Sequence, residues 1–116
     1  MRRILLGIAA LALSATAAFA GDEVLASRFG NTTITTDPSG MSTKIYYAAD
    51  HTFTGVAGDT HPAGTWEVKG SQVCLTFTAD APPGYPNPIC SPVSDHKVGD
   101  SWTAGPFQVQ LVEGIQ

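Results

Sequence analysis

The sequence predicts an all-β fold, a small antiparallel meander that curls into a barrel-like sheet. Short runs of alternating apolar and polar residues recur about every ten residues, and each run is bounded by Gly, Pro, Asp or Asn. No long stretch has the periodicity of an amphipathic helix, and the chain has no internal repeats. Seven or eight short strands at this spacing are typical of a small barrel. A β-sandwich is the alternative.

The first twenty residues are expected to be a cleaved signal peptide. Arg2 and Arg3 precede an apolar run at Ile4–Leu13, and Ala18-Phe19-Ala20 has the small-x-small pattern of a cleavage site. A membrane-spanning helix needs about 20 apolar residues, so this run is too short to be one. The alternative is an uncleaved N-terminal anchor. We therefore expect export to the periplasm or beyond, and a single β domain over residues 21–116.

The charge balance excludes several classes of partner. Without residues 1–20, four of the six basic residues remain against ten acidic ones, a net charge of −6. Binding to nucleic acid requires clustered Lys and Arg that displace counterions from the phosphates. An anionic membrane surface also attracts basic segments. Neither partner is expected for the cleaved chain.

Cys74 and Cys90 are the only cysteines and are expected to form a disulfide. Export would place them in an oxidising compartment, where one pairing is available. A redox-active pair would normally have Cys-x-x-Cys spacing, which this chain lacks.

The remaining elements follow from local patterns. A short helix is expected at Asp22–Arg28, ended by Gly30, and a disordered leader is the alternative. The segment Lys44–Phe77 reads as four consecutive antiparallel strands. Over the whole chain, strands are expected at residues 31–36, 42–48, 52–56, 65–69, 73–77, 89–94, 101–103 and 107–111. The inward-facing core is expected to contain Tyr47, Phe53, Trp66, Val68, Leu75, Phe77, Phe107 and Val109.

Three aromatic residues are candidates for contact with a ligand or partner. Tyr85 lies in a segment with four prolines in ten residues, Ala79–Pro88. Such a loop is rigid, which lowers the cost of ordering it on binding, and tyrosine supplies contact area with a polar tip. The alternative is that the loop only covers an open sheet edge. Tyr46 and Trp102 are the other two candidates.

The histidines and nearby aspartates offer only weak metal ligands. Following the strand order, Asp50, His51, Asp95 and His96 are expected at one end of the sheet, with His61 at the other. Solvated turn residues are the competing interpretation. No Gly-x-Ser-x-Gly elbow is present, and the acidic residues fall mostly at turns. We expect no cofactor and no enzymatic activity.

A set of short motifs resembles a known family. Gly30-Asn31-Thr32, Tyr46-Tyr47, Asp50-His51-Thr52-Phe53, Gly64-Thr65-Trp66 and Cys74 are similar to the pattern of small exported proteobacterial β-domain proteins. That family carries no established activity, so the resemblance implies an envelope location and a β fold. His51 stands where the family's hairpin usually has glycine, which disfavours a primed two-residue turn there.

The sequence favours a monomeric, non-catalytic binding module whose partner is a small molecule or another envelope protein. An envelope inhibitor of a lysozyme or protease, presenting Ala81–Pro88, is one alternative. A small hydrolase or metal-dependent enzyme is another. An interior cavity lined by Tyr47, Phe53 and Trp66 would favour a small molecule, whereas a filled interior with an exposed Tyr85 would favour a protein.

Overall fold

The computed structural model describes residues 21–116. The expected signal peptide at residues 1–20 lies outside these residues. Within residues 21–116, no helix has both the length and the apolar character needed to cross a membrane.

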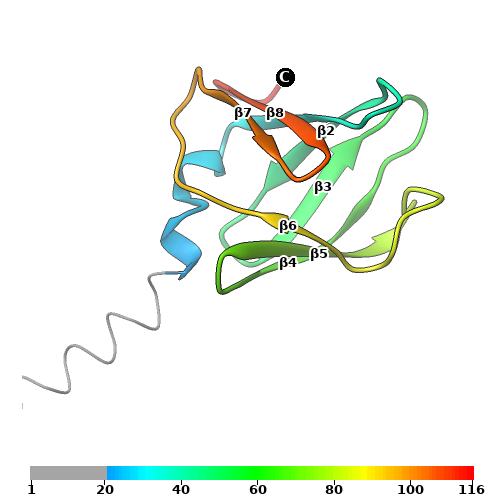
Figure 1. The fold of residues 1–116 in the computed structure, drawn as a ribbon, viewed down its shortest axis with the longest axis horizontal. Helices are drawn as coiled ribbons and strands as arrows, with labels where there is room; N and C mark the ends of the chain where they lie inside the picture. The colour runs from blue at the N-terminus through cyan, green and yellow to red at the C-terminus, as the bar shows by residue number, and fades with distance from the viewer. Residues whose placement is uncertain (1–20) are drawn as a thin grey trace, which may run out of the picture.

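Eight antiparallel strands form one sheet that curls into a nearly closed barrel (Figure 1). The strands are β1 (Thr32–Thr36), β2 (Ser42–Tyr47), β3 (Thr52–Val56), β4 (Ala63–Lys69), β5 (Gln72–Ala79), β6 (Ile89–Pro92), β7 (Ser101–Ala104) and β8 (Phe107–Val112). The expected all-β, barrel-like meander is therefore confirmed. The sandwich alternative is wrong, because the strands belong to a single sheet.

The order of strands in the sheet is β6-β5-β4-β3-β2-β1-β8-β7. As expected, β2 to β5 are consecutive neighbours. The C-terminal hairpin of β7 and β8 joins the other side of β1, which brings β7 and β6 to the two edges. Pro92 lies in edge strand β6, where its missing N–H removes no ladder hydrogen bond from the sheet interior.

Two glycines allow strands to approach closely where the sheet bends. A Cβ atom at Gly55 would lie 2.6 Å from the carbonyl oxygen of Lys44. A Cβ atom at Gly64 would overlap the carbonyl of Thr76, and the register of β4 shifts between Ala63 and Gly64. Curvature of a barrel wall is commonly introduced by such glycines and bulges.

The N-terminal segment covers one end of the barrel (Figure 1). Residues 21–23 are helical, residues 24 and 25 form a turn, and the 3-10 helix η1 (Ala26–Arg28) follows; the side chain of Leu25 is fully buried. The expected short helix is confirmed, and the disordered leader is wrong. Burial of Leu25 within the main core explains why so short a helix is stable.

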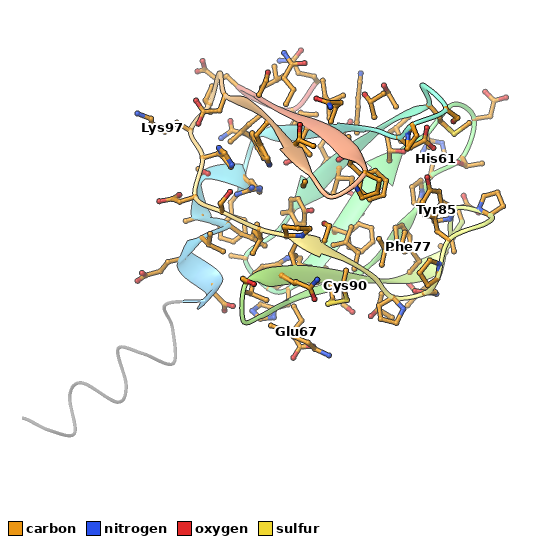
Figure 2. All side chains as sticks on the ribbon, in the orientation of Figure 1. His61, Glu67, Phe77, Tyr85, Cys90 and Lys97 are labelled. Carbon is orange, nitrogen blue, oxygen red and sulfur yellow. A yellow bond between two sulfur atoms is a disulfide. The ribbon has the colours of Figure 1, made fainter. Side chains whose placement is uncertain are left out.

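The barrel interior is only partly filled. Five of the expected core residues are buried, namely Tyr47, Phe53, Trp66, Leu75 and Val109. Val68, Phe77 and Phe107 are half-buried, which corrects the prediction for these three. Phe77 and Phe107 point inward but border an open space, and Figure 2 shows Phe77 directed into the barrel. The buried core also contains six apolar residues beyond the predicted set, namely Leu25, Ile45, Val73, Cys74, Ala104 and Leu111.

The expected disulfide joins Cys74 of β5 to Cys90 of β6. The two residues are direct partners in the β5–β6 ladder. The bond therefore fastens an edge strand to its single neighbour in the sheet.

Candidate functional site

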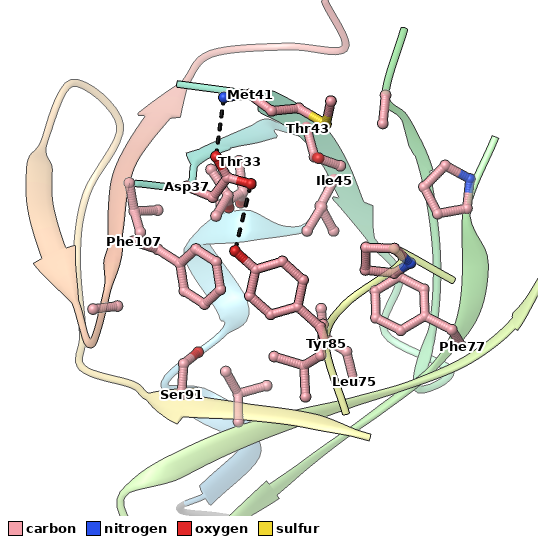
Figure 3. A pocket seen from close by; sticks show the side chains of 18 of the residues that line it. Thr33, Asp37, Met41, Thr43, Ile45, Leu75, Phe77, Tyr85, Ser91 and Phe107 are labelled. Atoms are coloured by element: carbon pink, nitrogen blue, oxygen red, sulfur yellow. Dashed lines mark hydrogen bonds between the residues drawn. The ribbon is translucent and has the colours of Figure 1, made fainter. Parts of the chain in front are cut away.

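A cavity of about 440 Å³ lies inside the barrel (Figure 3). Its wall is mainly apolar, because alternate residues of each strand face inward. The principal apolar side chains of the wall are Ile45, Leu75, Phe77, Ile89, Phe107 and Val109. Tyr47 also lines the cavity, but Phe53 and Trp66 do not. Those two pack in the closed core, so the expected trio does not line the cavity together.

The two ends of the cavity differ in character. One end lies towards the N-terminal segment, and the proline-rich loop around Tyr85 lies at the opposite end of the barrel (Figure 1). Arg28, from the N-terminal segment, lines the first end, which we call the floor. Tyr85 and Asp37 line the second end, which we call the mouth.

The floor holds a buried cation. The side chain of Arg28 is only 4% exposed and donates hydrogen bonds to the carbonyl oxygens of Val24 (2.9 Å) and Ser94 (3.3 Å). Its Cζ lies 5.2 Å from the ring centroid of Trp102, which is a cation–π contact. Among residues 21–116, no carboxylate lies within ion-pair distance of this guanidinium. Such burial is unusual, because buried charges are normally paired.

The neighbouring tyrosine does not neutralise this charge. Burial raises the pKa of Tyr47 to about 12, although the nearby Arg28 acts in the opposite direction. Tyr47 is therefore an uncharged phenol at neutral pH. Burial also lowers the pKa of Arg28, but an arginine starts so high that it stays cationic.

A second polar group in the wall lacks a partner. Thr33 is 3% exposed and lines the cavity from β1. Its Oγ1 has no hydrogen-bond partner among the described residues. A buried hydroxyl in this state costs free energy.

Tyr85 lies across the mouth. Its ring centroid is 5.9 Å from that of Phe107, and its hydroxyl donates to Asp37 Oδ2 at 3.4 Å (Figure 3). The pKa of Asp37 is lowered, first by the Ser39 hydroxyl, whereas desolvation raises the pKa of Tyr85. The candidate contact residue is thus half-buried at the cavity entrance.

The proline-rich loop also covers part of a sheet edge. β5 pairs with β6 only over Gln72–Leu75. Beyond that point, the Asn87 side chain accepts from the Phe77 N–H at 2.8 Å and donates to the Phe77 carbonyl at 2.9 Å. This amide occupies the hydrogen-bonding positions that a neighbouring strand would fill. The loop therefore has the edge-covering role considered as the alternative, in addition to its place at the mouth.

The other two aromatic candidates lie in different places. Trp102 lines the cavity beside Arg28, and the His96 ring stacks on it at 3.6 Å. Tyr46 is absent from the cavity wall, and its hydroxyl donates to the Gln116 carbonyl at 3.3 Å. The structure thus groups Tyr85 and Trp102 around one cavity and separates Tyr46 from them.

The weak metal candidates have separate partners. His51 Nε2 is 2.8 Å from Asp22 Oδ2, and its ring stacks on Trp66. Asp50 accepts hydrogen bonds from Thr52. Residues 21–116 contain no group of three or more side chains suited to hold a metal ion. The structure therefore does not assemble His51, His96, Asp50 and Asp95 into one site.

His51 also explains the hairpin between β2 and β3. Its φ is +72°, and its N–H donates to the Ala48 carbonyl while the Ala48 N–H donates to Thr52. This is a wider loop ending in a left-handed residue rather than a primed two-residue turn. The stacking on Trp66 and the bond to Asp22 compensate for a conformation that glycine would adopt more readily.

Comparison of the chain with protein-family models, with curated protein sequences and with solved structures gave no significant match. Functional inference consequently rests on the geometry of the cavity. That geometry defines a barrel-like β protein with an apolar interior cavity, a cationic floor and an aromatic mouth.

Proposed function

We propose that this protein is a non-catalytic binding module that holds a small apolar molecule inside its barrel. The interior cavity is the observation that carries this proposal. Sites for small ligands are concave, mainly apolar and about 300–1,000 Å³ in volume, with a few polar groups that orient the ligand. A cavity of about 440 Å³ with Arg28, Thr33 and Tyr85 in its wall fits each part of that description.

The volume sets the size of the ligand. An engineered apolar cavity of about 150 Å³ accommodates benzene, so the larger cavity corresponds to a molecule of roughly 15–20 non-hydrogen atoms. Such a molecule would displace water from the aromatic and aliphatic wall. Burial of apolar surface, at about 25 cal/mol per Å², would then drive binding.

We also place this activity in the periplasm or outside the cell. The Cys74–Cys90 disulfide supports an oxidising compartment. The N-terminal pattern described above supports export to it. A binding module there would capture its ligand from the envelope or the surroundings.

The test uses N-phenyl-1-naphthylamine, an uncharged probe that fluoresces in apolar surroundings. We expect saturable binding to the purified protein. Thr43→Phe, which adds a ring to an inward-facing position of the wall, should weaken binding about 10-fold, because overpacking costs on the order of 1–3 kcal/mol. Thr54→Phe is the matched control, since Thr54 is exposed on neighbouring β3 and does not line the cavity.

The outcomes separate the alternatives. Loss of binding in Thr43→Phe but not in Thr54→Phe supports an interior ligand. Equal effects of both variants would mean that the probe binds the surface, which refutes the proposal. A protein that binds no probe would also refute it, and the mouth loop would then be tested in pull-downs for an envelope partner.

A further inference from the structure

We infer that the ligand of this cavity is an apolar carboxylic acid whose carboxylate pairs with Arg28 at the floor while its apolar part extends towards the mouth. This inference rests on the proposed function and adds the chemical class of the ligand.

The Arg28 guanidinium has donors and a positive charge that its protein contacts leave partly unsatisfied. The group carries five N–H donors, and backbone carbonyl oxygens occupy two of them. The positive charge itself has no counter-ion within 4.0 Å among residues 21–116. Asp95 is the carboxylate whose charge acts on the pKa of Arg28, and it is an exposed residue outside the cavity wall. A ligand carboxylate would supply both the missing charge and acceptors for the remaining donors, in the planar geometry that guanidinium favours.

Thr33 contributes a second unsatisfied polar group, its unpartnered hydroxyl. It lies at the start of β1, directly after the segment that carries Arg28. Its proton is available for an acceptor that the described residues do not supply. Arg28 and Thr33 thus line the cavity from the same part of the chain, each with unused hydrogen-bonding capacity.

Two carboxylates near the mouth determine the direction of the ligand. Asp37 and Asp80 line the cavity on the side of the mouth, where a second anion would be repelled. Their carboxylates already accept protein donors: Asp37 from Ser39, Met41 and Tyr85, and Asp80 from the His61 N–H. An acid group is therefore favoured at the Arg28 end, and the aromatic rings of Tyr85 and Phe107 suit an apolar tail.

A purely structural role for Arg28 is the competing explanation. Its hydrogen bond to Val24 lies within the N-terminal segment, and its hydrogen bond to Ser94 ties that segment to the connection between β6 and β7. Neutral donors could make such bonds without burying a charge, so this role does not account for the cation. The two explanations make different predictions for ligands that differ only in their head group.

The experiment displaces N-phenyl-1-naphthylamine from the unaltered protein at pH 7 with dodecanoate, 1-dodecanol and dodecylammonium. A second acid and alcohol pair, 2-naphthoate and 2-naphthylmethanol, repeats the comparison with an aromatic ring system in place of the aliphatic chain. We expect an acid to bind at least about 10-fold more tightly than its matched alcohol, as charge-assisted hydrogen bonds imply, and the ammonium to bind most weakly. The pair that shows the larger preference for acid over alcohol indicates whether the apolar part of the ligand is an aliphatic chain or an aromatic ring.

Arg28 variants assign the preference to this residue. Arg28→Gln should reduce the preference of acid over alcohol to less than about threefold while the neutral probe still binds. Arg28→Lys, which keeps the charge but not the planar donor pair, should give an intermediate preference. If Arg28→Gln does not fold, the head-group series on the unaltered protein still decides. Probe binding without any acid preference overturns this inference but leaves the proposed function standing. Absence of probe binding overturns both, and an acid preference that survives Arg28→Gln overturns the role of Arg28.

Discussion

Removal of the Cys74–Cys90 disulfide should weaken both the fold and the cavity. The bond closes a loop of 16 residues, which the chain-entropy model converts to about 3 kcal/mol of stability. A domain of this size has a total stability of about 5–15 kcal/mol, so the loss is a substantial fraction. β6 is an edge strand held only by β5, and it supplies Ile89, Ser91 and Pro92 to the cavity wall. Its release would open one side of the cavity before the rest of the barrel unfolds.

The measurement is urea unfolding of the double variant Cys74→Ala/Cys90→Ala, followed by the fluorescence of Trp66 and Trp102, with probe binding recorded in the same solutions. We expect the free energy of unfolding to fall by about 3 kcal/mol. Probe binding should be lost at lower urea than the fluorescence transition. The reduced native protein is the control, since it keeps both sulfur atoms in place. A loss below about 1 kcal/mol in both samples, with the two transitions coinciding, would refute this account of β6.

Two further predictions concern the strands and turns. Gly64→Ala should lower the free energy of unfolding by about 1–3 kcal/mol, because the added methyl overlaps the Thr76 carbonyl. Urea unfolding midpoints measure this loss. Thr65→Ala, on the exposed face, is the control and should lower the free energy of unfolding by less. Stability should also fall as the pH drops below about 4, because turn hydrogen bonds lower the pKa of three aspartates in the folded state. The stability that these aspartates contribute is complete above the ordinary carboxyl pKa and is lost as the pH falls through the lowered pKa values. Equal urea midpoints at pH 6 and pH 2.5 would contradict this prediction. The three are Asp37, Asp50 and Asp100.

Much of the fold could be predicted because its signals are local. Alternation identifies each strand, and turn residues mark where one strand ends and the next begins. A proline such as Pro92 is typical of an edge strand or a bulge, and two cysteines permit only one pairing. Each of these inferences needs only neighbouring residues or a count.

The site could not be predicted because it depends on distances across the barrel. Alternation shows that Phe53 and Phe77 both face inward, but it does not show that one lies in closed core while the other borders a cavity. Arg28 appeared only as the end of a short helix. Its burial depends on packing of the N-terminal segment against Trp102 and the β6–β7 connection, which are more than sixty residues away. The sequence places Tyr85 in a proline-rich loop, yet its orientation over the mouth depends on Asp37 and Phe107.

The barrel interior has two parts, a closed core and an open cavity, and the volume of the cavity explains why the closed core is needed. A dry void of about 440 Å³ would cost on the order of 10 kcal/mol at about 24 cal/mol per Å³, which is comparable with the entire stability of such a domain. The empty space must therefore be accessible to solvent or ligand through the mouth. The closed core around Leu25, Phe53 and Trp66 supplies the packing that the open half lacks. A ligand that displaces solvent from the open half would add stability in proportion to the logarithm of its concentration over Kd. On this reasoning, an acid that binds at Arg28 should raise the melting temperature more than its matched alcohol does at the same concentration.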